Sequence, residues 1–207
     1  MKRGYRTEKD FLGAKKIPKK AYYGIQTKRA LQLFPISNLH LQKSIIYALV
    51  QIKKAAAMAN AQEKVLEQKK ARAIIKACND VLKGKEGDQF TVDVFQAGAG
   101  TSENMNVNEV IANRALEILK KKKGSYDIVH PNDHVNKSQS TNDVFHSAIH
   151  IAAYLNTKKL LLPALQKLQG NLEEKSKQWK KIIKSGRTHL KDAVPMTLGQ
   201  EFSGYAA

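Results

Sequence analysis

The sequence predicts a mainly α-helical protein. After residue 41, apolar residues recur every three or four positions over most of the chain, which is the spacing of one helix face. Proline is scarce, with 5 in 207 residues, and only 7% of the residues are aromatic, which favours helices packed through aliphatic side chains. We expect two domains: a mostly helical domain with short strands over residues 1–140, and the start of a long helical bundle over residues 141–207.

The first 82 residues predict short pieces followed by two helices. Residues 1–40 contain scattered glycine and proline turn signals, with room for a short strand at residues 21–27 and a turn or two of helix at residues 28–33. The helical period then runs over residues 41–62 and 66–82. Two consecutive helices with a short connection predict an αα-hairpin.

The only cysteine is Cys78, which excludes an internal disulfide. It falls on the apolar stripe of the helix predicted for residues 66–82. We therefore interpret it as a core residue and not as a nucleophile.

Two polar segments lie where helices are predicted to begin. The loop of small residues at 98–101 precedes a helix, which places Thr101 near its start. The segment HPNDHVNKSQSTNDVF, residues 130–145, likewise places Ser140, Thr141 and Asn142 at a helix start. A helix start offers unpaired backbone N–H groups and a positive dipole end, so it suits an anion such as a carboxylate. A capping box of Ser140 with Asp143 explains one or two of these residues but not the whole run.

The last part of the chain predicts a bundle helix. Apolar residues over 161–182 follow near-heptad spacing, which is typical of a helix packed in a bundle, and Pro163 permits a break or a new helix start. Residues 186–207 predict a polar loop and then the opening of another helix, inside which the sequence ends.

The charge restricts the partners. The net charge of +18 suggests nucleic acid, an anionic membrane or an anionic small molecule. The excess is mostly lysine, spread along the chain without interleaved aromatic residues, which is typical of solvated helix faces and not of a nucleic-acid surface. No apolar run approaches the ~18 residues of a membrane span, and the N-terminus lacks a secretory apolar region. We expect a cytoplasmic protein that binds neither membrane nor nucleic acid, and a basic nucleic-acid-binding module stays an alternative.

Three polar motifs occur in a characteristic order: GAGTSENMN at 98–106, HPNDHVNKSQSTND at 130–143 and GRTHLKDAVPMTLGQE at 186–201. With these motifs the chain resembles the aspartase/fumarase superfamily over essentially its whole length. The resemblance implies an N-terminal lyase domain followed by the first helices of a long central bundle. It also implies a homotetramer whose active sites gather residues from different subunits, and an elimination that yields fumarate or a related alkene.

The resemblance also assigns roles to residues. It implies that Thr101, Ser140 and Thr141 grip the carboxylate beside the deprotonated carbon. It places Asn142 and the catalytic residue His189 at the leaving amine, and Thr188 at the other carboxylate. Hydroxyl and N–H donors suit this chemistry, because the intermediate is an aci-carboxylate whose oxygens carry extra negative charge.

The motifs divide between two activities. The segments AYYGIQT, KKAAAMAN, GAGTS and DAVPMTLGQEF resemble aspartate ammonia-lyases, whereas SGYAA leans toward class II fumarate hydratases. We expect an ammonia-lyase acting on the small dicarboxylate aspartate, with fumarate hydratase as the alternative and a non-catalytic lyase-like subunit as a third reading. His130 with Asn132 resembles a second anion site of fumarases.

One feature of the family has no counterpart in the sequence. The family's catalytic base is a serine in a loop of the pattern GSSxMPxKxNP, which these 207 residues do not contain. We therefore expect the chain, as the N-terminal portion of such an enzyme, to be inactive alone. Magnesium activates some aspartases, but His146 and His150 have no third ligand in view, so we expect no cofactor and no metal.

Overall fold

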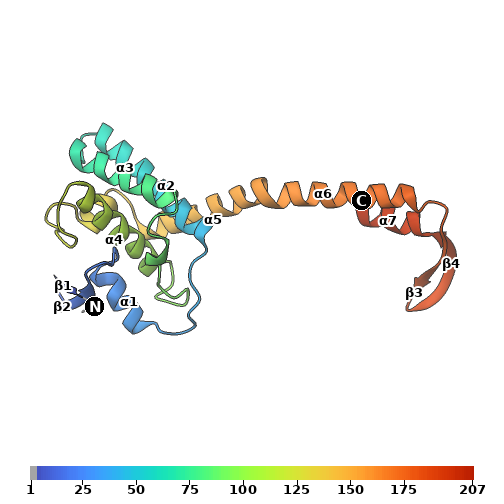
Figure 1. The fold of residues 1–207 in the computed structure, drawn as a ribbon, viewed down its shortest axis with the longest axis horizontal. Coiled ribbons are helices and arrows are strands. Elements are labelled where there is room, and N and C mark those ends of the chain that lie inside the picture. The colour runs from blue at the N-terminus through green and yellow to red at the C-terminus, as the bar shows by residue number, and fades with distance from the viewer. Residues whose placement is uncertain (1–3) are drawn as a thin grey trace. The chain divides into compact units, whose positions relative to one another are not determined.

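The computed structural model describes residues 4–207, and the chain forms two compact units, Met1–Ala152 (unit 1) and Ala153–Ala207 (unit 2). The predicted mainly α-helical fold is confirmed, with helices in both units and short antiparallel strand pairs beside them (Figure 1). The predicted domain boundary at residue 140 stays a prediction. No helix within residues 4–207 is long and apolar enough to cross a membrane.

The N-terminal part of unit 1 differs from the prediction. Strands β1 (Tyr5–Asp10) and β2 (Gly13–Pro18) form an antiparallel hairpin, and helix α1 (Ile25–Leu33) follows. The strand expected at residues 21–27 is wrong, because α1 already begins there. The carboxylate of Glu109 accepts hydrogen bonds from the backbone N–H groups of Gly24, Gln26 and Thr27, so a distant residue caps this helix.

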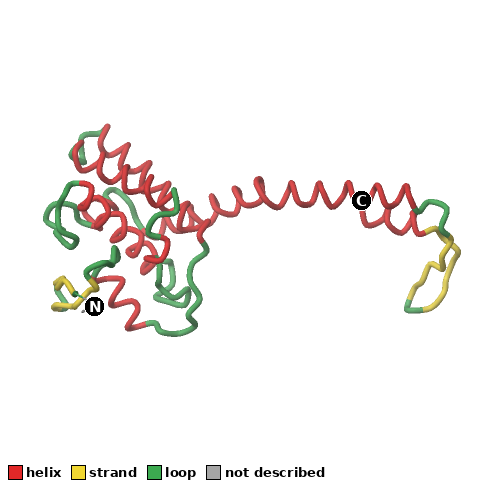
Figure 2. The backbone as a smooth tube through the Cα atoms, viewed as in Figure 1, coloured by secondary structure: helices red, strands yellow, loops and turns green. Residues whose placement is uncertain are grey.

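The core of unit 1 lies between three helices. Helices α2 (Lys43–Gln62) and α3 (Gln68–Leu82) form the predicted αα-hairpin, and α4 (Thr101–Ile118) packs against α3 (Figure 2). Cys78 lies fully buried among their apolar side chains, and burial raises the pKa of its thiol to about 12. It is therefore a core residue, as predicted.

Helix α4 is unusual because it buries polar side chains as well as apolar ones. Asn106 donates to the carbonyl of Gln89 in the short helix η1 (Gly87–Gln89), and Asn113 donates to the carbonyl of Tyr22. These amides satisfy backbone groups of loops that pack on α4, which buried polar atoms must do. The helix therefore positions loops that are distant in the sequence.

The end of unit 1 carries the segment singled out in the sequence. The π-helical turn η2 (Pro131–Val135) packs on α4, and helix α5 (Thr141–Asn156) begins where the sequence predicts a helix start. The π-helical turn η3 (Thr157–Leu161) then leads into α6 (Leu162–Gln178), and Pro163 falls in the first turn of that helix.

Unit 2 contains a strand pair where the sequence predicted a polar loop. Strands β3 (Ile183–Thr188) and β4 (Lys191–Thr197) form an antiparallel hairpin, and α7 (Leu198–Ala206) follows with a capping box of Thr197 and Gln200. The loop prediction is wrong because the turn residues His189 and Leu190, with φ of 50° and 63°, reverse the chain without glycine. Among the residues described, Leu162, Leu165 and Leu168 of α6 are exposed.

Helix α7 lies along α6. Ser176 donates to the carbonyl of Gly199, and the rings of Trp179 and Phe202 meet edge to face with centroids 4.7 Å apart. A Cβ on Gly199 would lie 2.8 Å from the backbone of Lys180, so glycine permits this close approach. These contacts hold the start of α7, which directly follows β4 in the sequence, against the end of α6.

Candidate active site

The starts of α4 and α5 lie side by side in unit 1. Gly100 precedes α4 with φ of 71°, a left-handed conformation that favours glycine. A Cβ at this position would overlap the ring of Phe145, which comes from the first turns of α5. Glycine therefore lets Phe145 seat on the loop before α4. This brings Thr101, the first residue of α4, near the start of α5.

Three predicted site residues surround the start of α5. Ser140 and Asn142 are exposed and Thr141 is half-buried. The Ser140 carbonyl accepts hydrogen bonds from the N–H groups of Asp143 (3.1 Å) and Val144 (3.0 Å), so its backbone begins the helix. Within residues 4–207 no side-chain capping bond between Ser140 and Asp143 is formed, which leaves the Ser140 hydroxyl for another partner.

A hydrogen bond joins the two helix starts. The side-chain amide of Asn104 on α4 donates to the Thr141 hydroxyl, with 2.9 Å between Nδ2 and Oγ1. Since the hydroxyl oxygen accepts this bond, its own hydrogen is available to donate elsewhere. Thr141 is thereby presented as a donor at a helix start, which suits an incoming carboxylate.

A buried polar chain continues behind Asn104. The Oδ1 atom of Asn136 accepts from the side-chain amides of Asn104 (3.2 Å) and Asn108 (3.3 Å) and from the ammonium of Lys53 (2.6 Å). Lys53 on α2 has no exposed surface, and burial lowers the pKa of its amine from 10.5 to about 7. A buried base with a depressed pKa, close to a candidate site, is a feature common at active sites.

Glu103 is the acidic residue nearest the start of α4. Its side chain is buried beside apolar residues such as Leu41 and Val107, and burial raises the pKa of its carboxyl to about 7. A protonated Glu103 carries no charge, so it opposes an anion at Thr101 less than an exposed carboxylate would.

The turn η2 is held by its own histidines. The Nδ1 atom of His130 accepts from the N–H groups of Asn132 (3.2 Å) and Asp133 (3.1 Å), and the backbone N–H of His130 donates to Nδ1 of His134 (2.7 Å). Lys70 on α3 lies 3.1 Å from Nε2 of His134. His130 therefore caps the turn through its ring, and a second anion site around His130 and Asn132 stays a prediction.

The remaining predicted residues belong to unit 2. Thr188 ends β3, and His189 occupies the turn of the β3–β4 hairpin with a left-handed backbone. Both side chains are exposed, and the ion pair of Arg187 with Asp192 (2.9 Å) closes the hairpin beside them. The six predicted residues thus form two groups: Thr101, Ser140, Thr141 and Asn142 in unit 1, and Thr188 with His189 in unit 2.

Residues 13–207 match the protein family described as Lyase. The chain belongs to this lyase family. The predicted resemblance to the aspartase/fumarase superfamily is confirmed, since named relatives of both kinds match the lyase over nearly its whole length. It is 54% identical over 200 residues to a class II fumarate hydratase of Wigglesworthia glossinidia brevipalpis, and 52% identical over 202 residues to an aspartate ammonia-lyase of Bacillus subtilis.

These matches cover 97% and 98% of this chain but only 43% and 42% of the relatives, so the chain spans less than half of their length.

Solved structures agree with the fold. A fumarate lyase:delta crystallin of Brucella melitensis matches with a TM-score of 0.93 at 50% identity, over 97% of the lyase and 46% of that chain. A class II fumarase of Schistosoma mansoni matches with a TM-score of 0.91 at 39% identity, over 98% of the lyase and 43% of that chain.

Sequence reasoning missed the buried residues behind the site. Asn104, Asn136 and Lys53 were not predicted to matter, although Asn104 and Asn108 stand four positions apart and so share a helix face. Within residues 4–207, no group of three or more His, Cys, Asp or Glu side chains is placed to hold a metal ion.

Proposed function

We propose that this chain supplies the carboxylate-binding part of an enzyme that eliminates ammonia from L-aspartate to give fumarate and catalyses the reverse addition, and that these 207 residues alone are inactive. One observation carries the proposal: at the paired starts of α4 and α5 the Thr141 hydroxyl accepts a hydrogen bond from Asn104, which leaves its own hydrogen free to donate to a carboxylate. The elimination places its greatest charge on such a carboxylate, so donors fixed there lower the barrier.

The chemistry follows from that placement. A base removes a proton from the carbon beside one carboxylate, and the electron pair moves into that carboxylate to give an aci-carboxylate with an added negative charge. Thr101, Ser140 and Thr141 donate to its oxygens, aided by the positive end of the α5 dipole. The electron pair then returns to form the carbon–carbon double bond as the carbon–nitrogen bond breaks, and ammonia leaves near Asn142.

Fumarate hydration is the second candidate. The same aci-carboxylate forms when water adds to fumarate, so the starts of α4 and α5 serve either reaction. The 54% identity to a class II fumarate hydratase supports it, while the motifs AYYGIQT, GAGTS and DAVPMTLGQEF favour aspartate.

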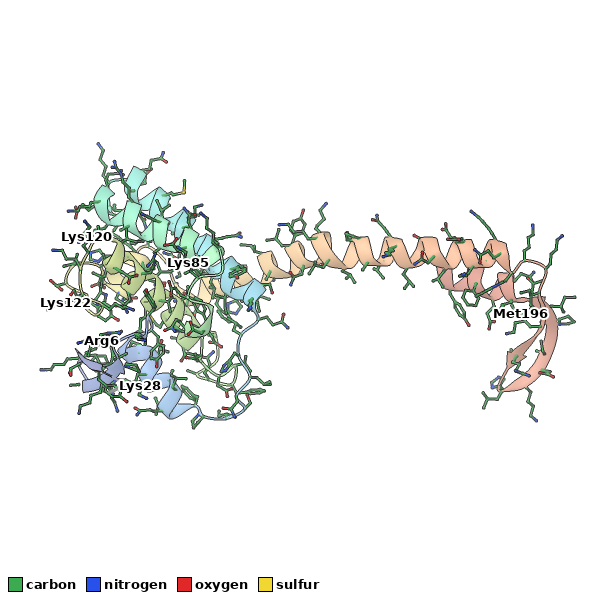
Figure 3. The ribbon with its side chains drawn as sticks, viewed as in Figure 1. Arg6, Lys28, Lys85, Lys120, Lys122 and Met196 are labelled. Carbon is green, nitrogen blue, oxygen red and sulfur yellow. The ribbon has the colours of Figure 1, made fainter. Side chains whose placement is uncertain are left out.

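A homotetramer is part of the proposal. The exposed leucines of α6 support association, because an uncovered stripe of large apolar side chains favours packing against another helix. Among the labelled side chains of unit 1, Lys28 comes from α1, Lys85 follows α3, and Lys120 and Lys122 follow α4 (Figure 3).

Product analysis tests the proposal. The product of the complete gene is incubated with fumarate, with and without ammonium, and the products are identified by proton NMR. Aspartate formed only with ammonium is the expected result. Malate formed without ammonium would replace the proposal with the second candidate, and the absence of both products would contradict both.

A further inference from the structure

Lys53 is a buried lysine without a counter-ion among the residues described. Its side chain is fully buried on α2, and within residues 4–207 its ammonium makes no ion pair and donates one hydrogen bond, to Asn136. Cys78 on α3 is the titratable group that acts on it, and that thiol stays protonated because burial raises its pKa to about 12. A buried charge without a counter-ion is costly, so its presence calls for a reason.

Two donors meet on the side-chain oxygen of Asn136. The protonated Lys53 amine can only donate, and it donates to Oδ1 of Asn136, whose Nδ2 atom donates to the carbonyl of Gln139 at 3.1 Å. The same oxygen accepts from the amide of Asn104, which also donates to Thr141. The Asn136 oxygen thereby holds the Asn104 NH₂ group where it donates to the Thr141 oxygen.

This orientation is kept although it leaves other atoms unpaired. The Oδ1 atoms of Asn104 and Asn108 are buried and find no partner among the residues described. Turning either amide over would bring its oxygen against the oxygen of Asn136, and for Asn104 it would reverse the hydrogen bond to Thr141. The donor at Lys53 opposes that reversal, since it holds the Asn136 oxygen in place.

We propose that Lys53 is a positioning residue for the lyase reaction: through Asn136 and Asn104 it sets the direction of the hydrogen bonds so that Thr141 donates to the substrate carboxylate. The inference rests on the proposed carboxylate site and holds for either substrate. Lys53 touches neither substrate nor reacting atoms and acts only through the two amides.

A double-mutant cycle tests this coupling. In the product of the complete gene, Lys53→Met removes the donor at nearly constant length, and Thr141→Val removes the hydroxyl that Lys53 is proposed to direct. Each single variant is expected to lower kcat about 10- to 100-fold, the usual effect of removing a group that orients a site residue. In the Thr141→Val background, Lys53→Met should change kcat by less than about twofold, because residues that act through one another are not additive.

Two further measurements keep the test decisive. Calorimetry measures the dissociation constant of the unreactive dicarboxylate succinate for the wild type, the two single variants and the double variant. The coupling between Lys53 and Thr141 can then be determined even where a variant shows no turnover. Product analysis of the wild type judges the proposed function separately. Lys54→Met, on the same helix and next in sequence, is the matched control and should leave both readouts unchanged.

The outcomes are distinct. Lys53→Gln, which keeps an N–H donor, should recover part of the lost kcat and serves as the second variant if Lys53→Met does not fold. Additive losses of Lys53→Met and Thr141→Val in both kcat and succinate binding would overturn the inference. So would a loss in Lys53→Met that Lys54→Met reproduces.

Discussion

Replacing Lys53 with methionine should stabilise unit 1 at neutral pH even though it impairs the site. Burial lowers the pKa of Lys53 from 10.5 to about 7, and a shift of this size corresponds to about 5 kcal/mol of unfavourable free energy for the buried ammonium. At pH 7 the folded amine is about half protonated, so about 4 kcal/mol of that cost acts on the wild type. Losing the hydrogen bond to Asn136 offsets about 1–2 kcal/mol, which leaves a net gain of about 2–3 kcal/mol.

The sign of the pH dependence follows from the same shift. The folded pKa lies below the unfolded one, so between pH 7 and 10.5 the folded state binds fewer protons than the unfolded state. The free energy of unfolding of the wild type therefore rises with pH across this window. The advantage of Lys53→Met should shrink over the same range and reverse at about pH 9–10, where the remaining cost of the buried ammonium falls below that of the lost hydrogen bond.

The single cysteine provides the assay. Cys78 is fully buried in the core of unit 1, so a pulse of thiol reagent at increasing urea labels it only in molecules whose unit 1 has opened. The urea midpoint of labelling at pH 7 should be higher for Lys53→Met than for the wild type and unchanged for Lys54→Met. A lower midpoint for Lys53→Met would refute the reasoning and would make Lys53 a structural residue.

Three further substitutions test individual contacts. Gly100→Ala should destabilise unit 1 by about 2–3 kcal/mol, because the added Cβ overlaps Phe145 and the backbone φ at this position is 71°. The urea midpoint of Cys78 labelling should fall accordingly, and an unchanged midpoint would contradict the packing of α5 on this loop. Glu109→Gln should lower the free energy of unfolding of unit 1 by about 1–3 kcal/mol, since the new NH₂ group would face the N–H donors at the start of α1. The backbone amides of residues 24–27 should then exchange their hydrogens faster. Gly199→Ala should detach α7 from α6, seen as a change in Trp179 fluorescence; unaltered fluorescence would refute that contact.

Helices with a regular apolar period could be predicted from the sequence, and helices fixed by distant residues could not. The period over residues 41–62 and 66–82 predicts α2 and α3 because these helices bury one face in the core. The start of α1 was missed because its cap, Glu109, lies 85 positions beyond Gly24. The β3–β4 hairpin was missed because His189 and Leu190 are not residues that usually form left-handed turns.

In the candidate site, too, features with a local sequence pattern could be predicted and features fixed by distant residues could not. The sequence predicted that Thr101, Ser140, Thr141 and Asn142 lie at helix starts, and α4 and α5 begin there, while their binding roles stay predictions. Lys53 could not be predicted, because the sequence contains 36 Lys and Arg residues and nothing adjacent marks this lysine as buried. Only the packing of α2 against η2 and α4 makes it a donor to Asn136.

A crystal structure of the complete gene product with bound succinate tests the central claim most directly. We predict one carboxylate at the starts of α4 and α5, with an oxygen about 2.7 Å from Oγ1 of Thr141. We also predict that Nδ2 of Asn104 keeps its hydrogen bond to that hydroxyl, now 2.9 Å. Succinate bound elsewhere, with Thr141 left without an anion, would contradict it.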